Sequence, residues 1–166
     1  MNASPMLRSG TSHGLPLVRS RAAGLLLRLR LALESLQPLA QLAARLYVAK
    51  VFFWSGLTKV RDWDTTLALF HDEYHVPWLP PELAALLGTG GELLLPVLLA
   101  AGLFGRFAAL GLSVVNAVAV LSLAEIAEPA LNQHVFWGSL LAGLLLWGPG
   151  RLSLDGLWAP RVLSWR

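Results

Sequence analysis

The sequence predicts an all-α fold, a four-helix transmembrane bundle with both chain termini on the cytoplasmic side. Composition is the first reason: 55% of the 166 residues are hydrophobic and only 14% are charged. A soluble domain carries about 25% charged residues, so this chain has too few charges to cover a water-facing surface. The second reason is that four apolar segments follow one another, separated by short loops. A spanning helix needs about 20 such residues, and 166 residues accommodate four spans.

The absence of cysteine narrows the chemistry further. It excludes disulfides, thiol nucleophiles, dithiol relays and thiolate-bound iron–sulfur clusters. The sequence also has no glycine-rich phosphate loop, serine nucleophile elbow, HExxH or CxxCH motif. The net charge of +3 is too small to predict nucleic-acid binding, and the position of the arginines is more informative. Any redox role must therefore depend on a bound cofactor or a partner.

Residues 1–38 form an arginine-rich N-terminal tail. Its arginines precede a single acid, Glu34, and its leucines are typical of a helix that lies among lipid headgroups. We expect a cytoplasmic tail that is partly interfacial or disordered. The lack of acids before Glu34 also resembles an organellar transit peptide. The arginines of this tail are Arg8, Arg19, Arg21, Arg28 and Arg30.

The first predicted span covers about residues 39–60, after Pro38 and before a polar run at 61–64. It is unusual because it contains three cations, Arg45, Lys50 and Lys59. Residues 61–80 combine acids, aromatic residues and prolines, which indicates an amphipathic interfacial segment followed by a turn.

Three further spans complete the predicted membrane domain, which extends over residues 39–150. A tight turn joins the second and third spans, and the fourth ends at a Gly-Pro-Gly sequence. Residues 151–166 then form a C-terminal tail. Helices in lipid pack through small residues, and we expect Gly56, Gly88 and Gly91 to serve this purpose. These spans cover about residues 82–103, 107–126 and 130–148.

The positive charges predict which side of the membrane each loop occupies. Loops rich in lysine and arginine stay in the cytoplasm. The N-terminal tail, the turn that contains Arg106 and the C-terminal tail all carry arginine, whereas the other two loops are acidic. Both termini are therefore predicted to be cytoplasmic.

Ionisable residues at membrane depth are the most informative for function, because each costs about 2.5–3.5 kcal/mol at a helix centre. Glu92 lies near the middle of the second span, where it cannot extend to water, so we expect it to pair with a cation or accept a proton. At about 100° per residue, Arg45 and Lys59 share one helix face and Lys50 lies off it. Arg45 and Lys59 are candidates for an inward polar seam, or they extend to the two membrane surfaces.

Two more polar residues occur within the predicted spans. Asn116 is expected to hydrogen-bond to a neighbouring helix. His134 begins the fourth span on the outer side, where it is either a satisfied polar residue or a proton-handling group. His71 and His75 are spaced for one helical face but have no third ligand nearby, so no metal site is predicted.

Three sequence runs together resemble the DoxX family. They are RLYVAKVFFWSGLTKV at 45–60, GGELLLP at 90–96 and GLFGRFAAL at 102–110, and the resemblance covers about residues 40–150. It implies a small bacterial inner-membrane protein of four helices. Some members are linked to thiosulfate oxidation with quinone as acceptor, and others to complexes that handle oxidative stress. The matching polar-motif residues are Arg45, Gly56, Lys59 and Glu92.

This chain departs from the family pattern in its long arginine-rich tail and in Lys50. Both features leave room for an added contact with anionic lipid.

The leading hypothesis is an accessory subunit of a membrane redox system, with a quinone-like ligand near Glu92. In this hypothesis Glu92 accepts a proton while Arg45 and Lys59 balance its charge. The partners would be the lipid bilayer, redox subunits and a second copy of the chain; any catalysis would belong to a quinone-linked oxidoreductase complex. A small proton-coupled carrier and a structural scaffold are the alternatives.

Overall fold

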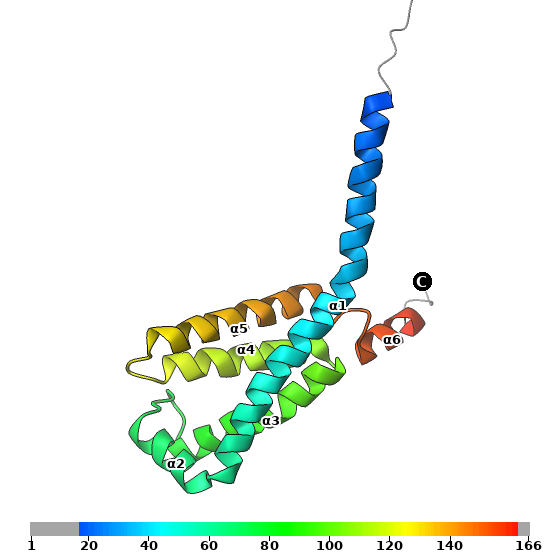
Figure 1. Ribbon diagram of the computed structural model, residues 1–166. Helices are drawn as coiled ribbons and strands as arrows, with labels where there is room; N and C mark the ends of the chain where they lie inside the picture. The colour runs from blue at the N-terminus through cyan, green and yellow to red at the C-terminus, as the bar shows by residue number, and fades with distance from the viewer. Residues whose placement is uncertain (1–16, 163–166) are drawn as a thin grey trace, which may run out of the picture. The chain divides into compact units, whose positions relative to one another are not determined.

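The computed structural model describes the backbone of residues 17–162 and the side chains of residues 23–158. Within this range all regular structure is helical, and no strand occurs. The predicted all-α class is therefore correct. Six helices follow in chain order: α1 (Leu17–Arg61), α2 (Trp63–Asp72), α3 (Pro81–Ala101), α4 (Gly105–Leu121), α5 (Glu128–Trp147) and α6 (Leu154–Val162) (Figure 1).

Helix α1 begins much earlier than the sequence predicts. It starts at Leu17 and continues without a break through Pro38, where the sequence suggested a boundary between the tail and the first span. The start of the membrane span stays a prediction. A proline inside a helix removes one hydrogen bond and costs about 3 kcal/mol, but strong helix formers flank it on both sides. The first half of the predicted tail, including Arg8, lies outside the described residues, as do residues 163–166.

The chain divides into two compact units after Ser35. The described part of the first unit is the beginning of α1. Its leucines are exposed, from 52% at Leu29 to 68% at Leu33. Arg30 pairs with Glu34 one turn later at 2.7 Å, and both side chains are exposed, so this pair contributes little to stability. Interfacial placement of this segment stays a prediction.

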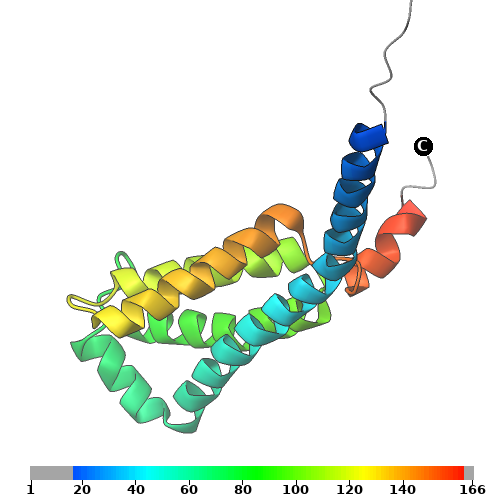
Figure 2. The same cartoon turned by 45° about the horizontal axis from the view of Figure 1, so that its top comes forward.

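The second unit contains one main hydrophobic core. The second half of α1 and helices α3, α4 and α5 all contribute to it, and Figures 1 and 2 show α4 and α5 side by side. Small residues of α4 allow these helices to approach closely. The buried core residues are Val48, Phe52, Leu99, Ala108, Ala109, Leu112, Leu141 and Leu144.

The lengths of these helices agree only in part with the predicted spans. Helix α3 is long and apolar enough to cross a membrane, and no other helix of residues 17–162 meets both criteria. Helix α4 is apolar but ends at Leu121, five residues before the predicted end, because the chain turns at Ser122. Its 17 residues correspond to about 25 Å, slightly less than the hydrocarbon thickness. Crossing by four helices stays a prediction.

The turn between α3 and α4 is held by the C-terminal part of the chain. Gly102 ends α3 with a φ of 66°, and Phe104 precedes α4 with a φ of 49°. The Asp155 carboxylate accepts hydrogen bonds from the backbone N–H groups of Phe104 at 2.9 Å and Gly105 at 2.7 Å. This side chain from α6 therefore caps the N-terminus of α4.

Helix α2 packs on the beginning of α3 in a second, smaller cluster. Phe70 contacts Ala84 and Ala85 there, and Tyr74 packs against them from the loop after α2. Asp62 caps α2 by accepting a hydrogen bond from the Thr65 N–H at 3.1 Å. This hydrogen bonding lowers the pKa of Asp62. The predicted segment at 61–80 thus contains a capped helix followed by a loop.

Candidate functional site

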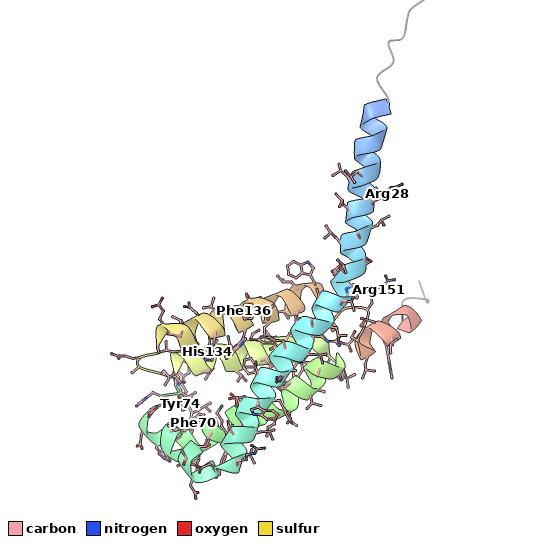
Figure 3. All side chains as sticks on the ribbon, in the orientation of Figure 1. Arg28, Phe70, Tyr74, His134, Phe136 and Arg151 are labelled. Atoms are coloured by element: carbon pink, nitrogen blue, oxygen red, sulfur yellow. The ribbon has the colours of Figure 1, made fainter. Side chains whose placement is uncertain are left out.

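A cavity of about 340 Å³ is lined by the C-terminal parts of α1 and α4 and by the first half of α3. Helix α2 with the loop after it and the start of α5 complete its wall. Most of its lining is apolar, and a few polar side chains converge on it. Figure 3 shows two of them, with Tyr74 after α2 and His134 at the start of α5. The polar lining residues are Ser55, Lys59, Tyr74, Glu92, Ser122 and His134.

An ion pair forms the most polar part of the cavity wall. The Lys59 ammonium lies 2.5 Å from Oε2 of Glu92. It also donates to Oγ of Ser55 at 3.1 Å, and the Ser55 hydroxyl donates to Oε1 of Glu92 at 3.3 Å. The Glu92 side chain is only 8% exposed and that of Lys59 22%. The carboxylate at mid-helix is therefore paired and hydrogen-bonded on both oxygens, as a buried charge requires.

Helical spacing explains how these three groups meet. Ser55 and Lys59 are four residues apart on α1 and lie on one face of it. Gly56 lies beside them, and a Cβ atom at this position would be 2.9 Å from Cγ of Leu93 and 3.1 Å from Cβ of Glu92. The missing side chain allows α1 and α3 to approach closely enough for the ion pair.

Replacing Gly56 with alanine is expected to lower the free energy of unfolding by about 1–3 kcal/mol, because the added carbon forces α1 and α3 apart. Detergent-induced unfolding followed by circular dichroism would measure it. Gly90 is the matched control, since a Cβ there meets nothing within 4 Å, and Gly90→Ala should be neutral or slightly stabilising. Equal stability of the two variants would show that α1 and α3 are not closely packed at Gly56.

Asn116 and His134 form a second polar group, of which His134 lines the cavity. Nδ2 of Asn116 donates to the backbone carbonyl of His134 at 3.0 Å, and Oδ1 of Asn116 lies 2.8 Å from Nδ1 of His134. The His134 ring also packs edge-on against Trp137, with ring centroids 5.0 Å apart. Asn116 thus joins α4 to α5, which is the interhelical contact that the sequence suggested for it.

Tyr74 closes the cavity on the side of α2. It packs on Phe70 with ring centroids 5.0 Å apart. Burial raises the pKa of the Tyr74 hydroxyl, and the neighbouring Glu73 carboxylate raises it further. This group is therefore a neutral hydroxyl at physiological pH, and it can donate or accept a hydrogen bond.

Arg45 lies away from this cavity, at the other end of the four-helix core. Its guanidinium is almost fully buried, with 1% exposure of the residue. Nη1 donates to the Pro149 carbonyl at 2.7 Å, and Nη2 donates to the carbonyls of Ala100 at 3.2 Å and Leu152 at 2.9 Å. Arg45 thus binds the carbonyl groups at the C-terminal end of α3 and in the chain after α5. It is fourteen residues from Lys59, about 21 Å along α1.

The remaining predicted residues are distributed as follows. Gly91 faces α4, where a Cβ would lie 3.1 Å from Val115, and Gly88 faces Phe70 at 3.7 Å. Lys50 is exposed, as the helical wheel predicts. His71 pairs with Glu82 at 3.0 Å, whereas His75 lies near the Glu73 carbonyl. Among the described residues, no group of three metal-ligating side chains occurs.

Three contributors to these contacts were missed from the sequence. Ser55 had a usable signal, because it lies one helical turn before Lys59 on the same face. Tyr74 was attributed only to an interfacial segment. Asp155 had no signal, since nothing in the sequence indicates that it reaches back to the start of α4.

Comparison with known proteins identifies the family. The model of the DoxX family matches residues 40–125, which is more than half of the chain and includes Arg45, Gly56, Lys59 and Glu92. No curated protein and no solved structure shows a significant match. The chain therefore belongs to the DoxX family, and this membership indicates a membrane protein.

Proposed function

We propose that this protein is an accessory subunit of a membrane redox system and that its cavity binds a quinone-like ligand beside Glu92. The observation that carries the proposal is a paired carboxylate and ammonium in the wall of an otherwise apolar cavity. Ionisable groups inside a membrane protein mark ligand or proton paths, because their insertion is costly and they persist where they are used.

The cavity fits a ligand of this class in size and lining. Its volume of about 340 Å³ falls at the lower end of small-molecule sites, and it accommodates a single ring. Phe70 and aliphatic residues of α3 and α4 provide apolar contacts, while Lys59, with one of its three N–H donors left after Ser55 and Glu92, offers a hydrogen bond to a carbonyl oxygen. A bound quinone would supply the electron transfer that a chain without cysteine lacks.

Each ionisable residue then has a distinct role. Glu92 is the proton acceptor at the ligand, because its carboxylate lines the cavity and is held in place by Ser55. Lys59 balances its charge and keeps the site neutral. Arg45 does not touch the cavity, and we assign it to the stability of the fold. In this proposal the protein resides in the bacterial inner membrane with both termini in the cytoplasm, in accord with the positions of Arg106 and Arg151.

Filling the cavity tests the proposal. Ala119 lines it, whereas Ala117 is exposed on the same helix, so Ala119→Phe and Ala117→Phe form a matched pair. The protein would be purified in native lipid particles, and extracted small molecules identified by mass spectrometry. We expect a quinone retained by the natural sequence and by Ala117→Phe, but reduced at least fivefold in Ala119→Phe.

Glu92→Gln provides the chemical arm of the same experiment. It keeps the shape of the side chain and removes the negative charge, and we expect it to weaken retention as well. Finding only bulk phospholipid in all four proteins would exclude the quinone site. Equal retention in all four would place the ligand elsewhere and favour a scaffold whose charges stabilise the fold.

A further inference from the structure

We infer that His134 is a hydrogen-bond acceptor in the cavity and that it selects a ligand with a neutral hydroxyl group. This inference rests on the proposed function and deepens it. Of the two redox forms of a quinone-like ring, the site would prefer the hydroxyl-bearing reduced form over the carbonyl-bearing oxidised form. This preference depends on which ring nitrogen of His134 carries the proton.

Asn116 determines the position of that proton. Its Nδ2 donates to the His134 backbone carbonyl at 3.0 Å, and a carbonyl can only accept. The amide oxygen must then be the atom that faces Nδ1 of His134 at 2.8 Å. An amide oxygen is only an acceptor, so Nδ1 carries the hydrogen. In the neutral imidazole the lone pair is therefore on Nε2.

Nε2 remains available to a ligand. Among the described residues no group donates to it, while the His134 side chain lines the cavity. The ring is held in its orientation by Asn116 on one side and by the edge of Trp137 on another. His134 therefore presents a fixed acceptor, and a ligand group that faces it must be a donor.

A hydroxyl and a carbonyl oxygen differ sharply at such a position. A hydroxyl donates to Nε2, whereas a carbonyl oxygen brings its lone pairs against the lone pair of the ring nitrogen. An acceptor left without a donor loses the hydrogen bond and remains desolvated, which corresponds to about a tenfold loss of affinity or more. The remaining N–H donor of Lys59 can bond to either form, so the discrimination belongs to His134.

Binding of a stable probe pair tests this inference without redox chemistry. An alkylphenol and its methyl ether share the ring and the chain and differ in the hydroxyl hydrogen. Binding to the full protein in lipid nanodiscs would be measured at pH 8, where an imidazole of ordinary pKa is neutral. We expect the phenol to bind about tenfold more tightly than the ether. In His134→Phe, which keeps a ring but loses the acceptor, this ratio should fall to about one.

Nitrogen NMR of the natural sequence measures the protonation of each ring nitrogen without any ligand. With ¹⁵N-labelled histidine, the expected spectrum shows a protonated Nδ1 and an unprotonated Nε2 for His134, and His134→Phe, where it folds, identifies these signals among the four histidines. A proton on Nε2 would overturn the inference. So would equal binding of phenol and ether to the natural protein, or a tenfold ratio that persists in His134→Phe. If neither probe binds, both the proposed function and the inference about His134 fail. If both probes bind equally, only the inference about His134 fails.

Discussion

Replacing Arg45 with methionine should lower the free energy of unfolding by more than about 4 kcal/mol. The guanidinium is almost fully buried and donates to three backbone carbonyls, those of Ala100, Pro149 and Leu152. Hydrogen bonds to charged groups contribute about 1.5–3 kcal/mol each. Methionine fills a similar space but donates none, so all three carbonyls lose this partner.

The measurement is unfolding in mixed detergent micelles, followed by circular dichroism. Arg151→Met is the matched control, because Arg151 is exposed in the same region and its loss should change stability by less than about 0.5 kcal/mol. Arg45→Lys should recover only part of the loss, since one ammonium cannot reach the directions that a planar guanidinium covers. Full stability of Arg45→Lys would show that charge alone matters here.

Replacing Glu92 with leucine should cost about 3 kcal/mol of stability. The substitution leaves the Lys59 ammonium in the cavity wall without its carboxylate, and breaking a buried pair by removing one partner costs about 3–5 kcal/mol. We expect the lower end of this range, because the Lys59 side chain is 22% exposed and retains some contact with solvent. The same micelle unfolding assay would measure the loss.

The double variant Glu92→Leu with Lys59→Met removes both charges, and so tests whether the loss of stability comes from the unpaired Lys59 ammonium or from the absence of the ion pair. Replacing a whole buried pair with apolar residues is often neutral or stabilising, so the double variant should recover to within about 1 kcal/mol of the natural protein. Lys50→Met is the control for loss of a lysine from α1, because Lys50 is exposed. A double variant as unstable as Glu92→Leu would mean that the pair does not exist in the folded protein.

The sequence predicted which residues occupy unusual positions, such as an acid in an apolar helix, more accurately than which residues contact one another in the fold. Glu92 stands out because an acid at mid-span is costly wherever the helix lies. The face of α1 that contains Phe52 and Gly56 follows from helical periodicity, and both residues are buried. That Lys59 is the partner of Glu92 could not be predicted, since the order of helices around a core has no local signal.

Arg45 illustrates a second limit of prediction from the sequence. Its position on the same face as Lys59 suggested one polar seam, and the structure gives the two residues separate environments at different levels of α1. The partners of Arg45 are backbone carbonyls, which every sequence contains, so no residue type marks them. The continuity of α1 through Pro38 was not predicted for a related reason: a proline signals a helix boundary only on average, and neighbouring residues with strong helical preference compensate for it.

The contacts of Arg45 also have a consequence for biosynthesis. Two of its three acceptors, Pro149 and Leu152, lie more than 100 residues after it in the chain. The cap of α4 comes from Asp155, 50 residues after Gly105. During translation, α1 and the turn at Gly102 emerge long before these partners exist. Until they are made, the Arg45 guanidinium lacks two of its acceptors and the N-terminus of α4 lacks its cap. The segment at 149–155 therefore completes contacts that involve α1 and the turn between α3 and α4.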